Sequence, residues 1–495
     1  MIDNYSWITV LPEIVLLALA CLIALVDLFV KGPNRSVTYV LSLLTLALVV
    51  FMQAAYASGG LNLYGFGDLV VSDRMGNWLK CFAALSVLVA LVYARPYAVP
   101  RDMMRGGELF TLSLFGLLGM FFMIGGNNFL VLYLGLELLT LSSYALVALR
   151  RDDTLATEAA MKYFVLGAMA SGFLLYGMSM LYGATGSLDI NRVAQAIATG
   201  QIRHQVLVFG LVFVVGGLAF KLGAVPFHMW VPDVYHGAPT AVTLLLGSAP
   251  KLAAFGLIMR LLVEGMLPLV LDWQQMLAVL AVASLAVGNI AAIAQANIKR
   301  MLGYSTIAHM GFVLLGLMSG VINGNTISSA DAYGSAMFYV ITYVLTVLAA
   351  FGVVMLLSRR GFESDEIADF AGLNQRSPLY AAVMAICIFS LAGIPPMVGF
   401  HAKLAVLQAL IASGQAVDIG LAVYAVVMSL IGAFYYLRVV KVMYFDAPVQ
   451  TAAIEAPADM RIVLSVNGLL VLLLGIVPGG LMALCADALA VMMGG

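Results

Sequence analysis

Apolar runs long enough to cross a membrane recur along the whole chain of 495 residues. A helix rises about 1.5 Å per residue, so roughly 20 apolar residues span the hydrocarbon core of a bilayer. Fourteen such runs are present, and they predict an all-α polytopic membrane protein with about 14 transmembrane helices. The predicted spans are 8–30, 36–57, 76–94, 107–124, 127–149, 156–183, 205–230, 239–262, 274–295, 301–320, 333–357, 379–411, 417–444 and 461–488.

The connectors leave little room for a soluble domain. The longest, 184–204, 358–378 and 445–460, are too short to fold alone, which predicts one polytopic unit. The chain begins without a basic segment and its first apolar run is full length. We therefore expect a retained helix there rather than a cleaved signal peptide.

Lysine and arginine are concentrated in the connectors that follow odd-numbered helices. Such connectors usually lie in the cytoplasm, so both termini are expected on the periplasmic side. The residues that indicate this are Lys31, Arg35, Arg95, Arg101, Arg105, Arg150, Arg151, Lys299, Arg300, Arg359, Arg360, Arg376, Arg438, Lys441 and Arg461.

Composition supports the membrane class and narrows the chemistry. The chain is 63% hydrophobic and 10% charged, with a mean hydropathy of +1.04, whereas soluble domains are about 25% charged. Its net charge is −1 with no basic cluster beyond the loops, so nucleic acid is not an expected partner. The four cysteines are scattered singly, and no P-loop or G-x-G-x-x-G motif follows a strand. We expect no redox centre, metal or nucleotide bound by this chain.

Helices four to eight and nine to thirteen look like two copies of one unit. Each copy has five helices, so the second would be inverted in the membrane relative to the first. This divides the chain into an amino-terminal three-helix segment, two inverted five-helix repeats, and a carboxy-terminal connector with the last helix. The corresponding ranges are 1–106, 107–262, 263–446 and 447–495.

One helix in each copy is expected to break near the middle of the membrane. Helix seven contains Pro226, and helix twelve contains Pro395 and Pro396. Proline removes a backbone donor and clashes with the preceding turn. Interrupted helices at corresponding places in two repeats indicate a binding site, although a simple kink is the alternative. A lysine close to each proline, Lys221 and Lys403, favours function.

Charged residues within apolar runs are the main candidates for chemistry. Lys221, Lys251 and Lys403 each lie in such a run, as does Glu137. A lysine at the membrane centre costs at least about 3 kcal/mol and usually handles ions or protons. We therefore expect a proton path, with Glu137 facing Lys221. A static ion pair between two helices is the alternative reading.

Helix dipoles suggest a difference between two of these lysines. Lys221 precedes its break and is expected beside the carbonyl end of a half-helix, whereas Lys403 follows its break and is expected beside an amide end. The ammonium form would then be stabilised more at Lys221. Two further residues stay open at this point. His309 is either a relay between Lys251 and Lys403 or a hydrogen-bonded core histidine, and Lys162 either modulates the Glu137–Lys221 pair or extends to the interface.

Three other charged residues lie near predicted helix ends. Asp27, Lys80 and Arg260 are expected at the membrane interface, where a long side chain can reach water.

Two long segments carry a family resemblance. FKLGAVPFHMWVPDVYHGAPT, before a lysine-bearing helix, and NIAAIAQANIKRMLGYSTIAHMGF resemble the antiporter-like membrane subunits of respiratory complex I. The family also includes subunits of Mrp-type sodium/proton antiporters and of membrane-bound hydrogenases. By position, the resemblance implies functional roles for Glu137, Lys221, Lys251 and Lys403. The opening LPEIVLLALACLIALVD, lysine at 403 and an end soon after helix fourteen favour one subunit type within the family.

The resemblance implies a proton-translocating subunit of an NADH:quinone oxidoreductase in a bacterial inner membrane. Protons would move from cytoplasm to periplasm, driven by quinone reduction. NADH, FMN, iron–sulfur clusters and quinone would be bound by partner subunits in a hetero-oligomer. A subunit of a Mrp-type Na⁺/H⁺ antiporter and a passive membrane scaffold are the alternatives.

Overall fold

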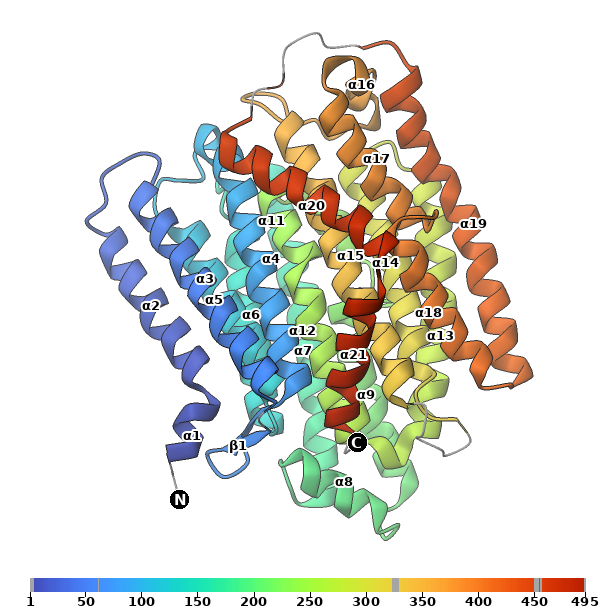
Figure 1. The fold of residues 1–495 in the computed structure, drawn as a ribbon. Coiled ribbons are helices and arrows are strands. Elements are labelled where there is room, and N and C mark those ends of the chain that lie inside the picture. Colours follow the sequence, from blue (N-terminus) through green and yellow to red (C-terminus); the bar gives the residue numbers. More distant parts are fainter. Residues whose placement is uncertain (1–3, 61, 323–328, 449–453, 455, 494–495) are drawn as a thin grey trace.

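Most of the chain lies in helices packed side by side (Figure 1). The computed structural model describes residues 4–60, 62–322, 329–448, 454 and 456–493, so the chain ends and part of the connector 445–460 lie outside the described residues. The helices are α1 (Asn4–Thr9), α2 (Leu11–Asp27), α3 (Ser36–Gly59), α4 (Arg74–Ala98), α5 (Glu108–Gly125), α6 (Phe129–Val147), α7 (Thr154–Thr185), α8 (Ile190–Ala198), α9 (His204–Leu222), α10 (Trp230–Gly237), α11 (Thr240–Gly247), α12 (Ala249–Ile258), α13 (Val270–Ile293), α14 (Ile298–Met318), α15 (Ser329–Leu357), α16 (Leu373–Arg376), α17 (Pro378–Ala392), α18 (Val398–Ala412), α19 (Ala416–Phe445), α20 (Ala458–Ile476) and α21 (Gly479–Met492).

Each predicted span overlaps a helix or a pair of helices, and the all-α membrane fold is confirmed. Within the described ranges, 12 helical segments are long and apolar enough to cross a membrane. The first predicted span corresponds to α2, of 17 residues, and the twelfth to the separate helices α17 and α18. A total of fourteen crossings therefore stays a prediction.

The structure divides two further predicted spans that the sequence analysis treated as continuous helices. The eighth is interrupted at Ser248, between α11 and α12, and the fourteenth at Val477 and Pro478, between α20 and α21. A proline lies at each interruption, Pro250 in the first turn of α12 and Pro478 before α21. Proline cannot continue the hydrogen bonding of a preceding helix but fits the first turn of a new one.

Polar residues set several helix starts. Asn128 accepts a hydrogen bond from the Leu130 amide before α6, and Asp153 accepts from the Leu155 amide before α7. The first amides of a helix have no partner within the helix, and these side chains provide one. The short carboxylate and amide side chains in the connectors therefore fix where the long apolar helices begin.

The most enclosed helices lie in the middle of the bundle. Almost all residues of α14 and α15 are buried, whereas most residues of α3 and α19 are not, and α3 and α19 lie at opposite flanks (Figure 1). α4, which is the third predicted span, packs against α11, α12 and α15. It therefore belongs to the centre of the bundle, although α2 and α3 are peripheral. α1 and the end of α21 lie toward the same end of the bundle (Figure 1).

One small β-hairpin was not expected from the sequence. β1 (Leu63–Gly65) pairs antiparallel with β2 (Val70–Ser72), with Tyr64 opposite Val71. The turn between the strands has positive φ at Phe66, Gly67 and Asp68. The hairpin joins α3 to α4, and its short strands carry little alternation that a sequence pattern could reveal.

Glycines bring the first two helices of each predicted repeat into close contact. A Cβ on Gly119 of α5 would lie 2.6 Å from the Gly135 carbonyl oxygen of α6. In the second copy, a Cβ on Gly288 of α13 would lie 2.6 Å from the Ala308 amide of α14. Small residues allow such approach between membrane helices. The shared packing of α5 with α6 and α13 with α14 supports the two-repeat interpretation, which stays a prediction.

Gly119→Ala should loosen the α5–α6 contact. The added methyl group meets backbone atoms that cannot move aside, which typically costs about 1–3 kcal/mol in a packed core. We expect less assembled protein in the membrane and a lower thermal midpoint after purification. Gly172→Ala in α7 is the matched control, because a Cβ there meets nothing within 4 Å. Equal midpoints for the two variants would contradict this account of the packing.

Candidate functional site

Both breaks predicted from proline are present. α9 ends at Gly223, with φ of 81°, and α17 ends at Gly393, with φ of 86°. In both segments proline follows three residues after the glycine, at Pro226 and Pro396. Helix then resumes as α10 and α18. The last carbonyls of α9 and α17 thus face the protein interior, where each needs a donor.

Lys251 supplies that donor at the end of α9. Its Nζ donates to the carbonyl oxygen of Leu222 at 2.8 Å and lies 3.4 Å from that of Lys221. Lys251 is 1% exposed, and its Nζ lies 5.3 Å from the centre of the Trp230 ring. The Trp230 indole donates to the Phe220 carbonyl at 2.9 Å. The half-helix end is therefore capped by a cation and an indole from two neighbouring helices.

Lys403 does the same at the end of α17. Its Nζ donates to the carbonyl oxygens of Leu391 at 3.1 Å and Ala392 at 2.8 Å. It also donates to Ser429 Oγ of α19 at 2.8 Å, and it lies 5.3 Å from the centre of the Phe312 ring. Lys403 belongs to α18 and reaches back across its own break to make these contacts.

The expectation that Lys403 lies beside an amide end was wrong, whereas the expected difference in charge between Lys221 and Lys403 stays a prediction. Lys403 lies against a carbonyl end, not an amide end, because its long side chain crosses the break. Lys221 turns away from the carbonyls of α9 and donates to Thr140 Oγ1 of α6 at 2.7 Å. By position at a break, Lys251 is the counterpart of Lys403.

Glu137 lies one turn before Thr140 on α6, close enough to act on Lys221 electrostatically. Among the described residues no ion pair closes between Glu137 and Lys221. The Glu137 Oε1 atom is buried and makes no hydrogen bond to the described protein atoms. The expected pair is therefore an electrostatic neighbourhood, with Thr140 holding the lysine.

His309 lies between two tyrosines. Its Nδ1 is 2.7 Å from the Tyr339 hydroxyl and its Nε2 is 3.1 Å from the Tyr436 hydroxyl. It is 6% exposed and has no direct contact with Lys251 or Lys403 among the hydrogen bonds of the described residues. A cavity of about 10 Å³, lined by His309, Ser390 and Ala402 among others, extends from the histidine toward α18. That is room for about one water molecule.

Lys162 pairs with two carboxylates and does not contact Glu137 or Lys221 among the ion pairs of the described residues. Its Nζ lies 2.8 Å from Glu158 and 3.0 Å from Asp233, and it is 45% exposed. Asp233 also pairs with Arg300 of α14 at 2.7 Å. Asp233 thereby ties α10, the second half of the broken helix, to α7 and α14.

Two residues expected at the interface are instead buried in ion pairs. Lys80 is 3% exposed and its Nζ lies 2.6 Å from Glu13. Arg260 is 1% exposed and lies 2.6 Å from both Asp73 and Glu264. Sequence position alone was misleading, because Glu13 and Asp73 lie far from Lys80 and Arg260 in the sequence, whereas Glu264 is one turn from Arg260. Asp27 lies near a helix end as expected and pairs with Arg35 at 3.5 Å.

Burial disfavours the charged form of Asp73, which precedes α4. The adjacent Arg260 guanidinium outweighs that effect and holds the pKa of Asp73 below its usual value. Asp73 and Arg260 are therefore both charged within the protein.

Sequence reasoning missed Thr140, Trp230 and Ser429. Each is a common core residue type, and only its contact with a lysine distinguishes it. A polar residue one turn from Glu137 was the available signal for Thr140, while Trp230 and Ser429 gave none.

Comparison with known proteins identifies the class that this fold defines. Residues 126–431 match the family described as NADH:quinone oxidoreductase/Mrp antiporter, TM. This chain belongs to that family, as its sequence motifs indicated.

Individual relatives extend over nearly the whole chain. NADH-quinone oxidoreductase subunit N of Polaromonas naphthalenivorans is 69% identical over 491 residues, covering 99% of this chain and 98% of that protein. A chain of respiratory complex I from Thermus thermophilus is similar at 31% identity and a TM-score of 0.79, covering 96% and 99% of the two chains. A chain of the Mrp complex from Dietzia sp. shares the fold, at 20% identity, a TM-score of 0.83 and coverage of 98% and 97%. The opening segment and Lys403 favoured one subunit type within the family. That type is subunit N, the name of the Polaromonas relative.

Removing Lys80 should destabilise the protein strongly. Lys80→Met leaves Glu13 buried without its cation, and breaking a buried pair typically costs about 3–5 kcal/mol. We expect a large loss of assembled protein, measured in membranes and by thermal denaturation. Lys441→Met is the control, because Lys441 is 63% exposed and surface pairs contribute about 0–1 kcal/mol.

The double variant Glu13→Gln with Lys80→Met separates charge from packing. Removing both charges should recover part of the lost stability. A double variant no more stable than Lys80→Met alone would contradict the ion-pair explanation.

Proposed function

We propose that this chain is a proton-translocating membrane-arm subunit of an NADH:quinone oxidoreductase. The observation that carries the proposal is the pair of broken helices whose carbonyl ends are capped by Lys251 and Lys403. Lysines so far inside an apolar bundle have few roles other than ion or proton handling. Membership of the family and the subunit name carried by a 69% identical relative agree with this function.

The proposed relay runs from the first broken helix to the second. A movement in a neighbouring subunit changes the interaction between Glu137 and Lys221. Lys221 passes a proton to Lys251, whose Nζ donates hydrogen bonds to the carbonyl oxygens of Lys221 and Leu222. Lys403 releases a proton toward the periplasm, with His309 and water in between. Lys162, which pairs with Asp233 of α10, modulates the Glu137–Lys221 pair.

The energy of a Glu137–Lys221 ion pair and the energy needed to move one proton across the membrane are of similar size. Two unit charges about 4 Å apart interact by about 4 kcal/mol at an effective dielectric of about 20. Moving one charge against 100 mV costs about 2.3 kcal/mol. Closing the Glu137–Lys221 pair, which is open in this structure, to about 4 Å would therefore supply energy of the size needed to move one proton.

Loss of a proton changes the bonding at each break. An ammonium group donates up to three hydrogen bonds and attracts carbonyl dipoles, whereas an amine attracts them less and has two hydrogens. Lys403 uses three acceptors, so its deprotonation frees at least one of Leu391, Ala392 and Ser429. Proton release is in this way coupled to the geometry of the break.

The remaining chemistry belongs to other subunits in this proposal. NADH, FMN, iron–sulfur clusters and quinone are bound by partners within a hetero-oligomeric complex in a bacterial inner membrane, in contact with lipid. Both termini face the periplasm, and the two inverted repeats are 107–262 and 263–446. The amino-terminal segment 1–106 and the carboxy-terminal segment 447–495 flank them.

A sodium/proton antiporter subunit is the second candidate, because the Mrp chain shares the fold. A hard cation needs several oxygen ligands, while the polar row here consists mainly of lysines. Protons fit this row better than sodium.

The first experiment tags the chain in its native membrane and extracts it gently. Co-purification of NADH:quinone reductase activity in a large complex is expected. Recovery of small membrane partners without NADH oxidation would contradict the proposal and favour the antiporter.

Lys251→Ala and Lys403→Ala then test the relay in the intact complex. Loss of a proton-transfer group slows the transfer by about 10²-fold or more, so we expect proton pumping in membrane vesicles to fall to background. Lys441→Ala is the control for loss of a charge at an exposed position. Complexes that assemble and pump normally with both substitutions would leave only a scaffold role.

A further inference from the structure

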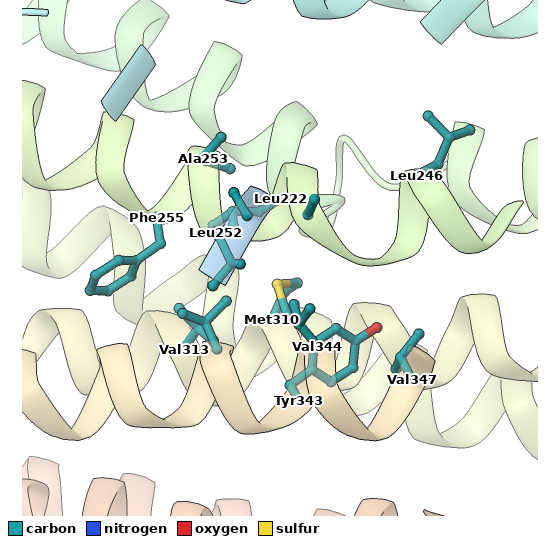
Figure 2. Close-up of a cluster of buried hydrophobic side chains, with 14 of the residues drawn as sticks. Leu222, Leu246, Leu252, Ala253, Phe255, Met310, Val313, Tyr343, Val344 and Val347 are labelled. Carbon is teal, nitrogen blue, oxygen red and sulfur yellow. The ribbon is translucent and has the colours of Figure 1, made fainter. Parts of the chain in front are cut away.

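Apolar side chains fill the contact between the lysine-bearing helices and the histidine-bearing helix. Leu222 and Leu252, neighbours of Lys221 and Lys251, face Met310 and Val313 of α14 (Figure 2). All four side chains are fully buried. These side chains offer no hydrogen-bonding group to a proton passing straight from Lys251 to His309.

A row of hydroxyl groups lies beside this cluster. The Tyr343 hydroxyl of α15 donates to Thr306 Oγ1 of α14 at 2.7 Å. Tyr235 of α10 is fully buried, and its hydroxyl makes no hydrogen bond to the described protein atoms. Its ring packs against α14 one turn before Thr306, where a Cβ on Gly303 would lie 3.5 Å from it. A buried hydroxyl without a partner is costly, and these three groups come from three different helices.

The Tyr235 hydroxyl lies against the α11–α12 segment that carries Lys251. A Cβ on Gly247 would be 3.2 Å from the Tyr235 hydroxyl, and Gly247 precedes Lys251 by one helical turn across the Ser248 break. The Tyr235 ring also contacts Trp230, at 6.3 Å between ring centres, and Trp230 is the ring over which the Lys251 Nζ lies.

The Tyr343 end of the row lies next to His309. The rings of Tyr343 and His309 are 5.1 Å apart between centres. Tyr339 and Tyr436, the two hydrogen-bond partners of His309, lie within electrostatic reach of Tyr343. The hydroxyl row thus connects the surroundings of Lys251 with those of His309.

We propose that protons cross between the two repeats through the hydroxyls of Tyr235, Thr306 and Tyr343, around the apolar cluster of Leu222, Leu252, Met310 and Val313. This inference rests on the proton-translocating function proposed above. It assigns a path-forming role to three uncharged residues and an insulating role to the apolar cluster beside them.

Each transfer conserves one proton. The Tyr235 oxygen gains a proton from the Lys251 side as its own hydroxyl hydrogen passes to Thr306. Thr306 then passes a hydrogen to Tyr343, which passes one toward His309. At rest Tyr343 donates to Thr306, and Thr306 donates to the Leu302 carbonyl at 2.8 Å. Both hydroxyls must therefore turn before a proton moves in the pumping direction.

Substitutions that remove only the hydroxyls test this route in the intact complex. Tyr235→Phe and Tyr343→Phe keep the rings. We expect each to slow proton pumping by about tenfold or more. Tyr333→Phe is the matched control, because Tyr333 also lies buried on α15 with a hydroxyl that has no hydrogen-bond partner among the described atoms. It should pump normally.

Thr306 provides a test that does not depend on aromatic packing. Thr306→Val keeps the shape and should lose pumping, whereas Thr306→Ser keeps the hydroxyl and should retain it. Equal loss in both variants, or normal pumping in Tyr235→Phe and Tyr343→Phe, would overturn the route. If Lys251→Ala abolishes pumping while the hydroxyl variants pump normally, this route fails and the proposed function stands. If Lys251→Ala also pumps normally, the proposed function fails as well.

Discussion

A helix that stops inside an apolar bundle must find donors for its last carbonyl groups, and this requirement organises the whole structure. Water can satisfy such groups at a surface, but the hydrocarbon interior offers none. At the end of α9 the donors are Lys251 and Trp230, and at the end of α17 the donor is Lys403. Without these bonds the two breaks would leave partial negative charges unsatisfied.

The same contacts explain why lysine is tolerated there. A carbonyl end of a helix carries partial negative charge, so it offsets part of the cost of burying an ammonium group. The carbonyl end at each break therefore stabilises a buried cation, and the cation in turn satisfies the carbonyl groups of that break. A proton that arrives or leaves changes both at once, which gives a physical link between charge movement and helix geometry.

Much of this arrangement could be predicted from the sequence. Pro226 and Pro396 indicated the breaks, and the apolar surroundings of Lys221, Lys251 and Lys403 indicated the lysines. The sequence could not indicate which groups each lysine side chain reaches. Lys403 reaches back across its break, and Lys221 turns to Thr140, because a flexible four-carbon side chain can serve several positions. Such choices depend on packing and have no local signal.

The uncharged residues of the proposed route, Tyr235, Thr306 and Tyr343, could not be predicted from the sequence either. Tyr235 lies between two predicted spans and Tyr343 lies within one, and neither has a local sequence signal for a place beside Thr306. Likewise Lys80 and Arg260 read as interfacial, because Glu13 and Asp73 lie on elements far away in sequence. Contacts between distant segments decide these cases.

The central claim is that Lys251 and Lys403, which cap the two breaks, belong to one series of polar groups and bound water that also includes Glu137 and His309. An experimental map of the intact complex, detailed enough to show ordered water, tests it most directly. We expect water bonded to Glu137 Oε1 and water in the cavity between His309 and Ser390. Dry sites at both places, with apolar side chains closed around them, would contradict it.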